Sequence, residues 1–173
     1  MATRLLSQLA RASALAAVMT LVVVGNAAVA QKKPAWFVIC IDEKDAKTCR
    51  IVQKLFTEQG VKGKQRTYGK VLSLTVAYGG TPRQPVLVMD MPLGVDLRPG
   101  MVLRVDNRKE MTAPYLRCTG EGCTSRIALT PPVLAMLRRG SKLHVGFRPF
   151  SSNQTLVVDA SLIGFSKAFA RIR

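Results

Sequence analysis

The fold is decided by the stretch Val71-Leu72-Ser73-Leu74-Thr75-Val76-Ala77-Tyr78. Its even-numbered residues are all apolar, and alternate residues of a β-strand point to the same face of its sheet. One face of this segment is therefore suited to a hydrophobic core. The run Gly-Gly-Thr-Pro at 79–82 ends it with turn-forming residues. The pattern predicts a strand that is buried on one side.

Similar β-prone runs, each bounded by turn residues, lie on both sides of this segment. They cover residues 36–40, 49–57, 85–91, 101–106, 115–118, 124–129, 143–147 and 156–160. Residues 60–66 are expected to form a basic loop. One helix is expected, with Thr130 as its N-cap, Pro131 at its first position and Gly140 at its end. Strands at this spacing with one short helix predict an all-β fold, an antiparallel β-sandwich with immunoglobulin-like layers.

The composition and length indicate one folded domain. The chain has 173 residues, of which 48% are hydrophobic. These values exclude a disordered or collagen-like polymer, and the length is too short for two ordinary domains. We therefore expect a single β-sandwich domain at residues 31–173, preceded by an N-terminal segment of a different kind.

Residues 1–30 have the pattern of a signal peptide. Arg4 and Arg11 precede an uncharged run at 12–24, which leads to Ala28-Val29-Ala30. The run is shorter than the roughly 20 residues that a helix needs to cross a membrane, so cleavage after Ala30 is favoured over a permanent anchor. We expect the remaining chain in the periplasm, associated with the outer membrane, or secreted.

The chain has four cysteines: Cys40, Cys49, Cys118 and Cys123. An exported protein meets an oxidising environment, which favours disulfides, and three pairings are possible. We favour Cys40 with Cys49 and Cys118 with Cys123, because the residues inside each pair are typical of turns. The alternative is a four-cysteine zinc site, although Cys40 and Cys49 lie further apart than the usual zinc ligand pair. The Cys-x-x-Cys spacing of a redox dithiol is absent from the sequence.

Residues for catalysis are scarce in this sequence. His144 is the single histidine, and it alternates with Leu143 and Val145, so we expect it to point to solvent. The sequence contains no G-x-S-x-G, P-loop or H-E-x-x-H motif. We therefore expect a protein that is not an enzyme and uses no cofactor or metal. A hydrolase built around His144 is the opposing hypothesis.

Positive charge is the most unusual surface property of the chain. It has 26 Lys and Arg against 10 Asp and Glu, a formal net charge of +16. Such a surface attracts polyanions. The local concentrations, which we take as candidate contacts to an anionic partner, are Lys62, Lys64, Arg66, Arg108, Lys109, Arg138, Arg139 and Lys142.

The expected partners follow from charge and location. Anionic envelope lipids, lipopolysaccharide, acidic host glycans and a protein partner are all compatible with a cationic exported protein. Nucleic acid is not expected, because the chain is predicted to be exported and lacks an aromatic stacking motif of the RNA-binding type. The alternative is a structural periplasmic protein whose charge confers solubility and has no dedicated ligand.

The order of several short features resembles the invasion-associated locus B family of alphaproteobacteria. The features run over nearly the whole chain after residue 30, and the ordered set is more specific than any one of them. They are Trp36 before Cys40, Cys49, Met91-Pro92-Leu93-Gly94-Val95 with Leu97 and Gly100, Cys118 with Gly122-Cys123, the Leu134, Leu137 and Gly140 helix, and the closing Ser161-Leu162-Ile163-Gly164-Phe165-Ser166-Lys167-Ala168-Phe169.

The resemblance implies an exported, non-enzymatic β-sandwich of the periplasm or outer membrane, linked to virulence through entry into host cells such as erythrocytes. It implies no catalytic residues. Each family feature also has a structural explanation: Pro92 and Gly94 set a turn, and Gly164 and Phe165 fit a final strand packed on the core. We therefore expect an interaction module with a basic face for anionic envelope or host-surface partners.

Overall fold

The computed structural model describes residues 35–43, 46–62 and 65–172, which lie within one compact unit. The elements in this part of the chain are antiparallel strands, two short α-helices and a closing 3-10 helix at Ala170–Ile172. In chain order they are β1 (Phe37–Glu43), β2 (Ala46–Lys62), β3 (Gln65–Gly79), β4 (Gln84–Met91), β5 (Met101–Val105), β6 (Met111–Ala113), β7 (Tyr115–Thr119), β8 (Gly122–Ala128), α1 (Pro131–Arg139), β9 (Lys142–Phe147), β10 (Leu156–Ser161) and α2 (Phe165–Phe169).

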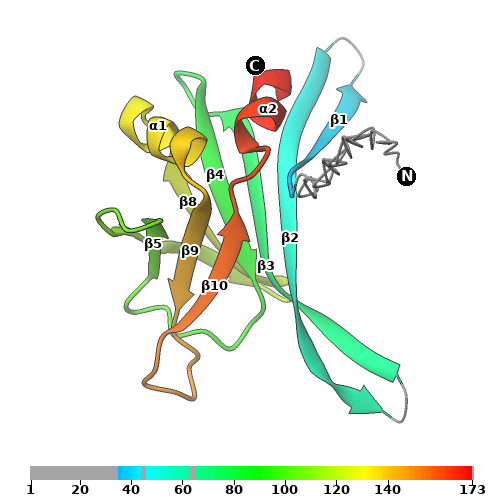
Figure 1. Cartoon of the computed structure of the whole chain (residues 1–173), viewed down its shortest axis with the longest axis vertical. Coiled ribbons are helices and arrows are strands. Elements are labelled where there is room, and N and C mark those ends of the chain that lie inside the picture. Colours follow the sequence, from blue (N-terminus) through cyan, green and yellow to red (C-terminus); the bar gives the residue numbers. More distant parts are fainter. Residues whose placement is uncertain (1–34, 44–45, 63–64, 173) are drawn as a thin grey trace, which may run out of the picture. The chain divides into compact units, whose positions relative to one another are not determined.

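The strands form two antiparallel sheets around one apolar core, which confirms the predicted β-sandwich (Figure 1). One sheet has the order β1-β2-β3-β4-β8-β7, and the other has the order β10-β9-β5-β6. Leu72, Leu74 and Val76 of β3 are completely buried, as their alternation predicts. Residues of the other sheet, including Leu103 and Val145, complete the same core.

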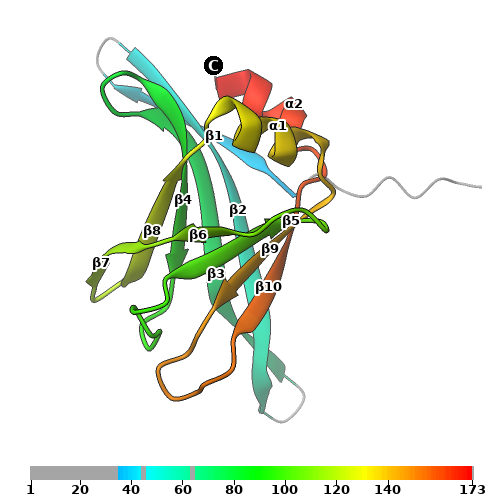
Figure 2. The same ribbon diagram turned by 90° about the vertical axis from the view of Figure 1, so that its left-hand side faces the viewer.

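The chain passes from one sheet to the other at Pro114. β6 pairs with β5 in the four-stranded sheet, and β7 pairs with β8 in the six-stranded sheet (Figure 2). The Ser125 hydroxyl, which is fully buried, donates a hydrogen bond of 2.7 Å to the Pro114 carbonyl. Since proline has no backbone N–H to donate to a neighbouring strand, it suits this break between two strands. The strand β6 was not predicted from the sequence.

The structure contains the two predicted disulfides, Cys40–Cys49 and Cys118–Cys123. Each joins residues that lie directly opposite each other on neighbouring strands, β1 with β2 and β7 with β8. The prediction of a turn between Cys40 and Cys49 was wrong for 41–43 and 46–48, which continue the two strands. The two disulfides therefore fasten the two outermost strands of the six-stranded sheet.

The basic loop predicted at 60–66 was also largely wrong, because strand pairing continues into it. β2 extends to Lys62 and β3 begins at Gln65, and Val61 pairs with Arg66. The register shifts twice along this pair, between Leu55 and Phe56 and between Glu58 and Gly60. These irregularities obscure the period-two pattern on which the sequence prediction depended. The result is a long β2–β3 hairpin (Figure 1).

The predicted helix is present as α1, with proline in its first turn. Thr130 occupies the N-cap position without a side-chain capping hydrogen bond, although its carbonyl accepts the Leu134 N–H at 2.8 Å. Gly140 follows the helix with extended backbone, not the left-handed conformation that would explain a glycine there. A Cβ atom at this position would lie 2.4 Å from Cγ1 of Val105. Close packing therefore requires the glycine.

The final strand predicted at Gly164 and Phe165 was wrong, because this segment forms α2. Gly164 has a φ of 84°, a left-handed conformation that ends the extended chain after β10. Phe165 then contacts the Trp36 ring edge to face, with 5.2 Å between ring centroids. Phe165 also stacks on Phe169 at 5.8 Å. Aromatic packing against the sandwich thus stabilises a helix that is too short to be stable alone.

We expect Gly140→Ala to lower the free energy of unfolding by about 1–3 kcal/mol, because the added methyl group would overlap Val105 and Leu162. Gly120→Ala is the matched control, since a Cβ there meets no atom within 4 Å. Urea denaturation of both variants checks this. Equal stability of the two variants would contradict the packing explanation.

We expect the double change Cys40→Ser and Cys49→Ser to lower the free energy of unfolding by about 2–3 kcal/mol, from the entropy of the loop that the disulfide closes. Amide hydrogen exchange should become much faster in β1 than in β4, because the outermost strand loses its covalent attachment. Denaturation and exchange measured by NMR check the two parts. Unchanged protection of β1 would show that backbone pairing alone holds it.

Candidate interaction surface

The structure describes the predicted basic residues only in part. Lys64 lies outside the described residues, as do the side chains of Lys62 and Arg66. The backbone of Lys62 and Arg66 lies near the tip of the β2–β3 hairpin. Figure 1 shows the tip of this hairpin at the opposite end of the domain from α1 and α2. The backbone at Lys62 and Arg66 therefore lies far from the two helices.

The other two basic groups, far apart in the sequence, are brought together by Asp106. Its carboxylate accepts hydrogen bonds from the backbone N–H of Ser141, at 3.1 Å, and of Lys142, at 2.9 Å. Its own N–H donates to the Lys142 carbonyl at 3.0 Å. The turn after β5 is thus fixed beside the start of β9 and the end of α1. We name the exposed residues Arg108, Lys109, Arg138, Arg139 and Lys142 the helical-end patch.

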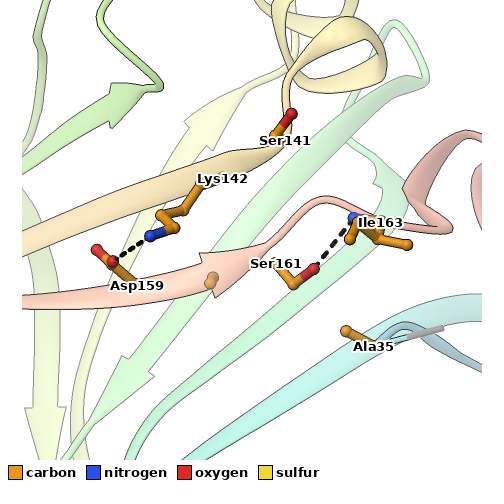
Figure 3. A pocket seen from close by; sticks show the side chains of 7 residues that line it. Ala35, Ser141, Lys142, Asp159, Ser161 and Ile163 are labelled. Carbon is orange, nitrogen blue, oxygen red and sulfur yellow. Dashed lines mark hydrogen bonds and ion pairs between the residues drawn. The ribbon is translucent and has the colours of Figure 1, made fainter. Parts of the chain in front are cut away.

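Two members of the helical-end patch have internal partners. The Lys142 ammonium lies 2.9 Å from Asp159 on β10, beside a shallow cavity of about 390 Å³ (Figure 3). The Arg138 guanidinium lies over the Phe169 ring, 5.7 Å from its centroid. Within residues 35–172 as described, Arg108, Lys109 and Arg139 are exposed and have no carboxylate partner. These three charges are available to an external anion.

The structure adds two basic residues that the sequence analysis did not single out. Lys167 of α2 and Arg171 of the 3-10 helix are both exposed. The Ser166 hydroxyl donates a hydrogen bond of 3.0 Å to the Arg138 carbonyl, which ties α2 to the last turn of α1. Residues four positions apart, such as Lys167 and Arg171, lie on the same face of a helix. The sequence analysis did not group them because it predicted a strand here.

His144 lies on the outer side of the four-stranded sheet, as its alternation predicts, and its side chain is 21% exposed. Its Nδ1 lies 2.7 Å from the Asp159 carboxylate on the neighbouring strand. Hydrogen bonding to Lys142, and then to His144, lowers the pKa of Asp159. Among the described residues, no hydroxyl or thiol hydrogen-bonds to the imidazole. No group of potential metal ligands occurs in this part of the chain either.

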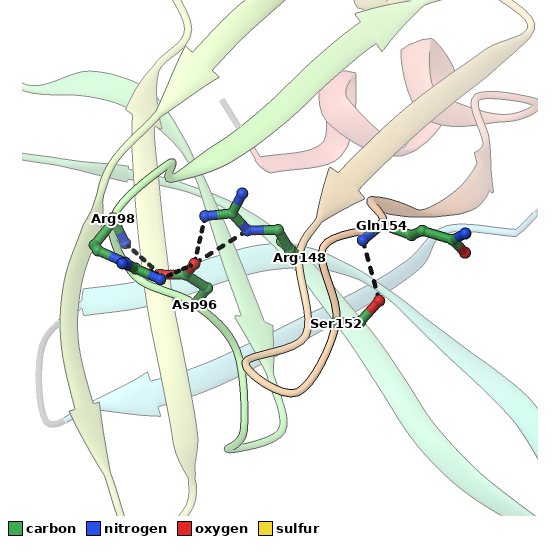
Figure 4. Close-up of polar contacts among 5 residues, drawn as sticks. All are labelled: Asp96, Arg98, Arg148, Ser152 and Gln154. Atoms are coloured by element: carbon green, nitrogen blue, oxygen red, sulfur yellow. Dashed lines mark hydrogen bonds and ion pairs between the residues drawn. The ribbon is translucent and has the colours of Figure 1, made fainter.

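A buried carboxylate, Asp96, lies on the loop between β4 and β5 (Figure 4). Arg98 donates two side-chain hydrogen bonds of 2.9 Å to it, and Arg148 donates from Nε at 3.0 Å and also from Nη2. Backbone bonds reinforce this contact, because the Asp96 N–H donates to the Arg148 carbonyl at 2.8 Å. The cluster joins the loop to the end of β9. No spacing pattern in the sequence pointed to it.

The charges of this cluster shift the pKa values of its members. Hydrogen bonds from Arg98, and then from Arg148, hold the pKa of Asp96 well below its usual range despite burial of the carboxylate. Asp96 in turn raises the pKa of Arg98. Burial, with a smaller contribution from the Asp96 charge, raises the pKa of Tyr115 to about 12. Asp96 therefore stays ionised at neutral and mildly acidic pH, and its role is structural.

Comparison with known proteins identifies the family. The family model described as Invasion associated locus B (IalB) protein matches residues 36–173. The chain belongs to the invasion associated locus B family. Two curated relatives are invasion protein B homologues of Brucella abortus, strain 2308 and biovar 1 strain 9-941. Each is 27% identical over 139 residues, which cover 80% of this chain and 75% of the relative.

A solved structure of the same family supports the fold. The crystal structure of invasion associated protein B from Bartonella henselae matches with a TM-score of 0.66 and 21% identity, covering 80% of this chain and 90% of that one. The resemblance found in the sequence to the invasion associated locus B family is thus confirmed, together with the two-sheet antiparallel fold. In the described residues, no helix has the length and apolarity that crossing a membrane requires.

The dependence of stability on pH tests the role of Asp96. Because its pKa is lower in the folded than in the unfolded chain, its contribution to stability is complete above the unfolded value of about 4. It is lost as the pH falls through the folded value. We expect Asp96→Asn to lower the melting temperature at pH 7 and to reduce the loss of stability on acidification below pH 4. Thermal melts between pH 2 and 7 check this, and parallel curves for the two proteins would contradict it.

Proposed function

We propose that this member of the invasion associated locus B family is an exported, non-enzymatic envelope protein that binds anionic partners through the helical-end patch. The partners share negative charge: anionic envelope lipids, lipopolysaccharide or acidic glycans of a host surface. In this proposal the binding aids host-cell invasion. The observation that carries it is that Asp106 holds the turn with Arg108 and Lys109 beside the segment that follows Arg139. All three basic residues are exposed and have no carboxylate partner among the described residues.

The local structure supports binding because the patch is held in place before a ligand arrives. Asp106 fixes the β5–β6 turn against the start of β9, and Ser166 ties α2 to α1. Less ordering is then required on binding than for a flexible basic tail. Arg138 and Arg139 also lie in the last turn of α1, where the helix dipole favours cations. A set of preorganised cations attracts extended polyanions at low ionic strength.

Export is the second part of the proposal. Residues 1–30 have the basic start, apolar run and small-residue cleavage pattern of a signal peptide. All four cysteines form disulfides, which persist in the periplasm and outside the cell. The curated relatives named as invasion protein B homologues support a role in invasion.

Retention on heparin and on anionic phospholipid vesicles at low salt tests the binding. We expect the purified protein to be retained and to elute as salt rises, because screening weakens each charge contact. The triple variant Arg108→Gln, Lys109→Gln, Arg139→Gln should elute at clearly lower salt. The matched control, Lys54→Gln, Arg117→Gln, Arg126→Gln, removes the same charge from exposed residues of the six-stranded sheet. It should elute close to the unmodified protein.

The outcomes separate three interpretations. A selective effect of the helical-end variant supports the proposal. Equal effects of both variants would show that net charge alone drives retention. The helical-end patch would then not be a specific binding site. No retention at any ionic strength would leave the alternative of a structural envelope protein without a dedicated ligand.

A further inference from the structure

The outermost strand β1 has an open edge in the part of the chain that the structure describes. β1 pairs with β2 on one side only and lies at the end of the six-stranded sheet (Figure 1). We infer that this edge, together with α2, is a binding site for an extended, carboxylate-bearing segment of a partner protein, which adds to the sheet as a further strand. This site uses residues other than those of the helical-end patch and goes beyond the function proposed above.

The register shows which backbone groups face outward. The Cα atoms of Cys40 and Cys49 lie 4.0 Å apart, the short spacing of an antiparallel pair that does not exchange hydrogen bonds. Because the two pair types alternate, Ile39 and Ile41 bond to β2, whereas Val38, Cys40 and Asp42 direct their N–H and C=O groups away from it. These groups form the ladder that an added strand requires.

The other edges in the described residues are irregular, short or partly occupied. β7 follows Pro114 and has a register shift between Tyr115 and Arg117, which interrupts regular pairing. β6 has three residues. On β10, the Ser161 carbonyl already accepts hydrogen bonds from Trp36 and Gln53. In contrast, β1 keeps one unbroken register over seven residues, and a disulfide prevents it from being pulled off β2.

Apolar side chains accompany the open edge. Phe37, Ile39 and Ile41 all lie on the outer face of β1, and they are 66%, 40% and 43% exposed. Soluble proteins usually protect an open edge with charge, a bulge or proline. A regular edge with an exposed apolar row is the arrangement that strand addition uses, because alternate side chains of the ligand can pack beside it.

The basic side chains near Val38 indicate that the partner segment carries a carboxylate. A cavity of about 400 Å³ lies there between β1 and α2 and is lined by Trp36, Phe37, Val38, Gly164, Lys167, Ala168 and Arg171. Its apolar wall can receive a side chain of the ligand. Lys167 and Arg171 are exposed at its rim, and neither has a carboxylate partner among the described residues. An added strand whose acidic residue or C-terminal carboxylate lies at this end would neutralise both cations.

Selection from a phage-displayed library of random linear peptides tests the site on the purified protein. We expect enriched peptides to alternate apolar residues and to carry Asp, Glu or a free C-terminus at one end. A synthetic copy of the most enriched peptide should slow hydrogen exchange at the Val38 and Cys40 amides more than at Ile39, whose amide already bonds to β2. Its copy with Asn or Gln in place of the acids should bind roughly tenfold more weakly.

Two variants test the two halves of the site. Val38→Pro removes an outward N–H without removing a bond to β2 and should abolish peptide binding, whereas Val38→Thr keeps the N–H and should bind normally. Lys167→Gln with Arg171→Gln should weaken binding roughly tenfold. Should Val38→Pro lower the melting temperature strongly, Asp42→Pro removes the next accessible outward N–H, since Cys40 is held in the disulfide.

The results also separate this site from the function proposed above. Val38→Pro should leave heparin retention unchanged, because it alters no charge. The inference is overturned if no peptide is enriched, if enriched peptides lack carboxylates, or if binding survives Val38→Pro in a folded protein. It is equally overturned if the protein dimerises through β1, which would show that a second copy occupies the edge.

Discussion

The structure depends on the burial of one face of β3 between the two sheets. Leu72, Leu74 and Val76 have no solvent exposure, and each fully buried aliphatic side chain of this kind contributes about 1.5–3 kcal/mol. They pack in one core with Met101, Leu103 and Val145 of the opposite sheet. Since alternate residues point the other way, Val71, Ser73 and Thr75 lie on the opposite face of the same strand. The apolar core thus follows from the alternation in the sequence.

Three carboxylates make contacts that hold separate parts of the fold together. Asp96 binds two arginines at the end of β9, Asp106 binds the backbone beside α1, and Asp159 binds Lys142 and His144. The chain has only 10 acidic residues. Because 26 Lys and Arg outnumber them, many basic side chains have no carboxylate with which to pair. The helical-end patch therefore keeps charges that the composition alone would not locate.

The sequence was sufficient for features governed by local pattern, and insufficient for those governed by tertiary contact. The period-two strands, the helix after Thr130 and both disulfides were predicted, because alternation, turn residues and short loops are visible in the chain. The strand predicted at Gly164 forms α2 because Phe165 packs on Trp36, a contact over more than a hundred residues. The Asp96 cluster and the role of Asp106 depend on similar long-range contacts, which no spacing reveals.

The length of the β2–β3 hairpin separates the two basic ends electrostatically. Gln53 of β2 contacts Ser161 near α2, whereas Lys62 lies nine positions further along the strand, about 30 Å away at roughly 3.3 Å per residue. That distance is several times the Debye length of about 8 Å at physiological ionic strength. Charge at one end therefore neither strengthens nor weakens anion attraction at the other. A small anion meets one end at a time, and only a ligand of polymer or membrane dimensions spans both.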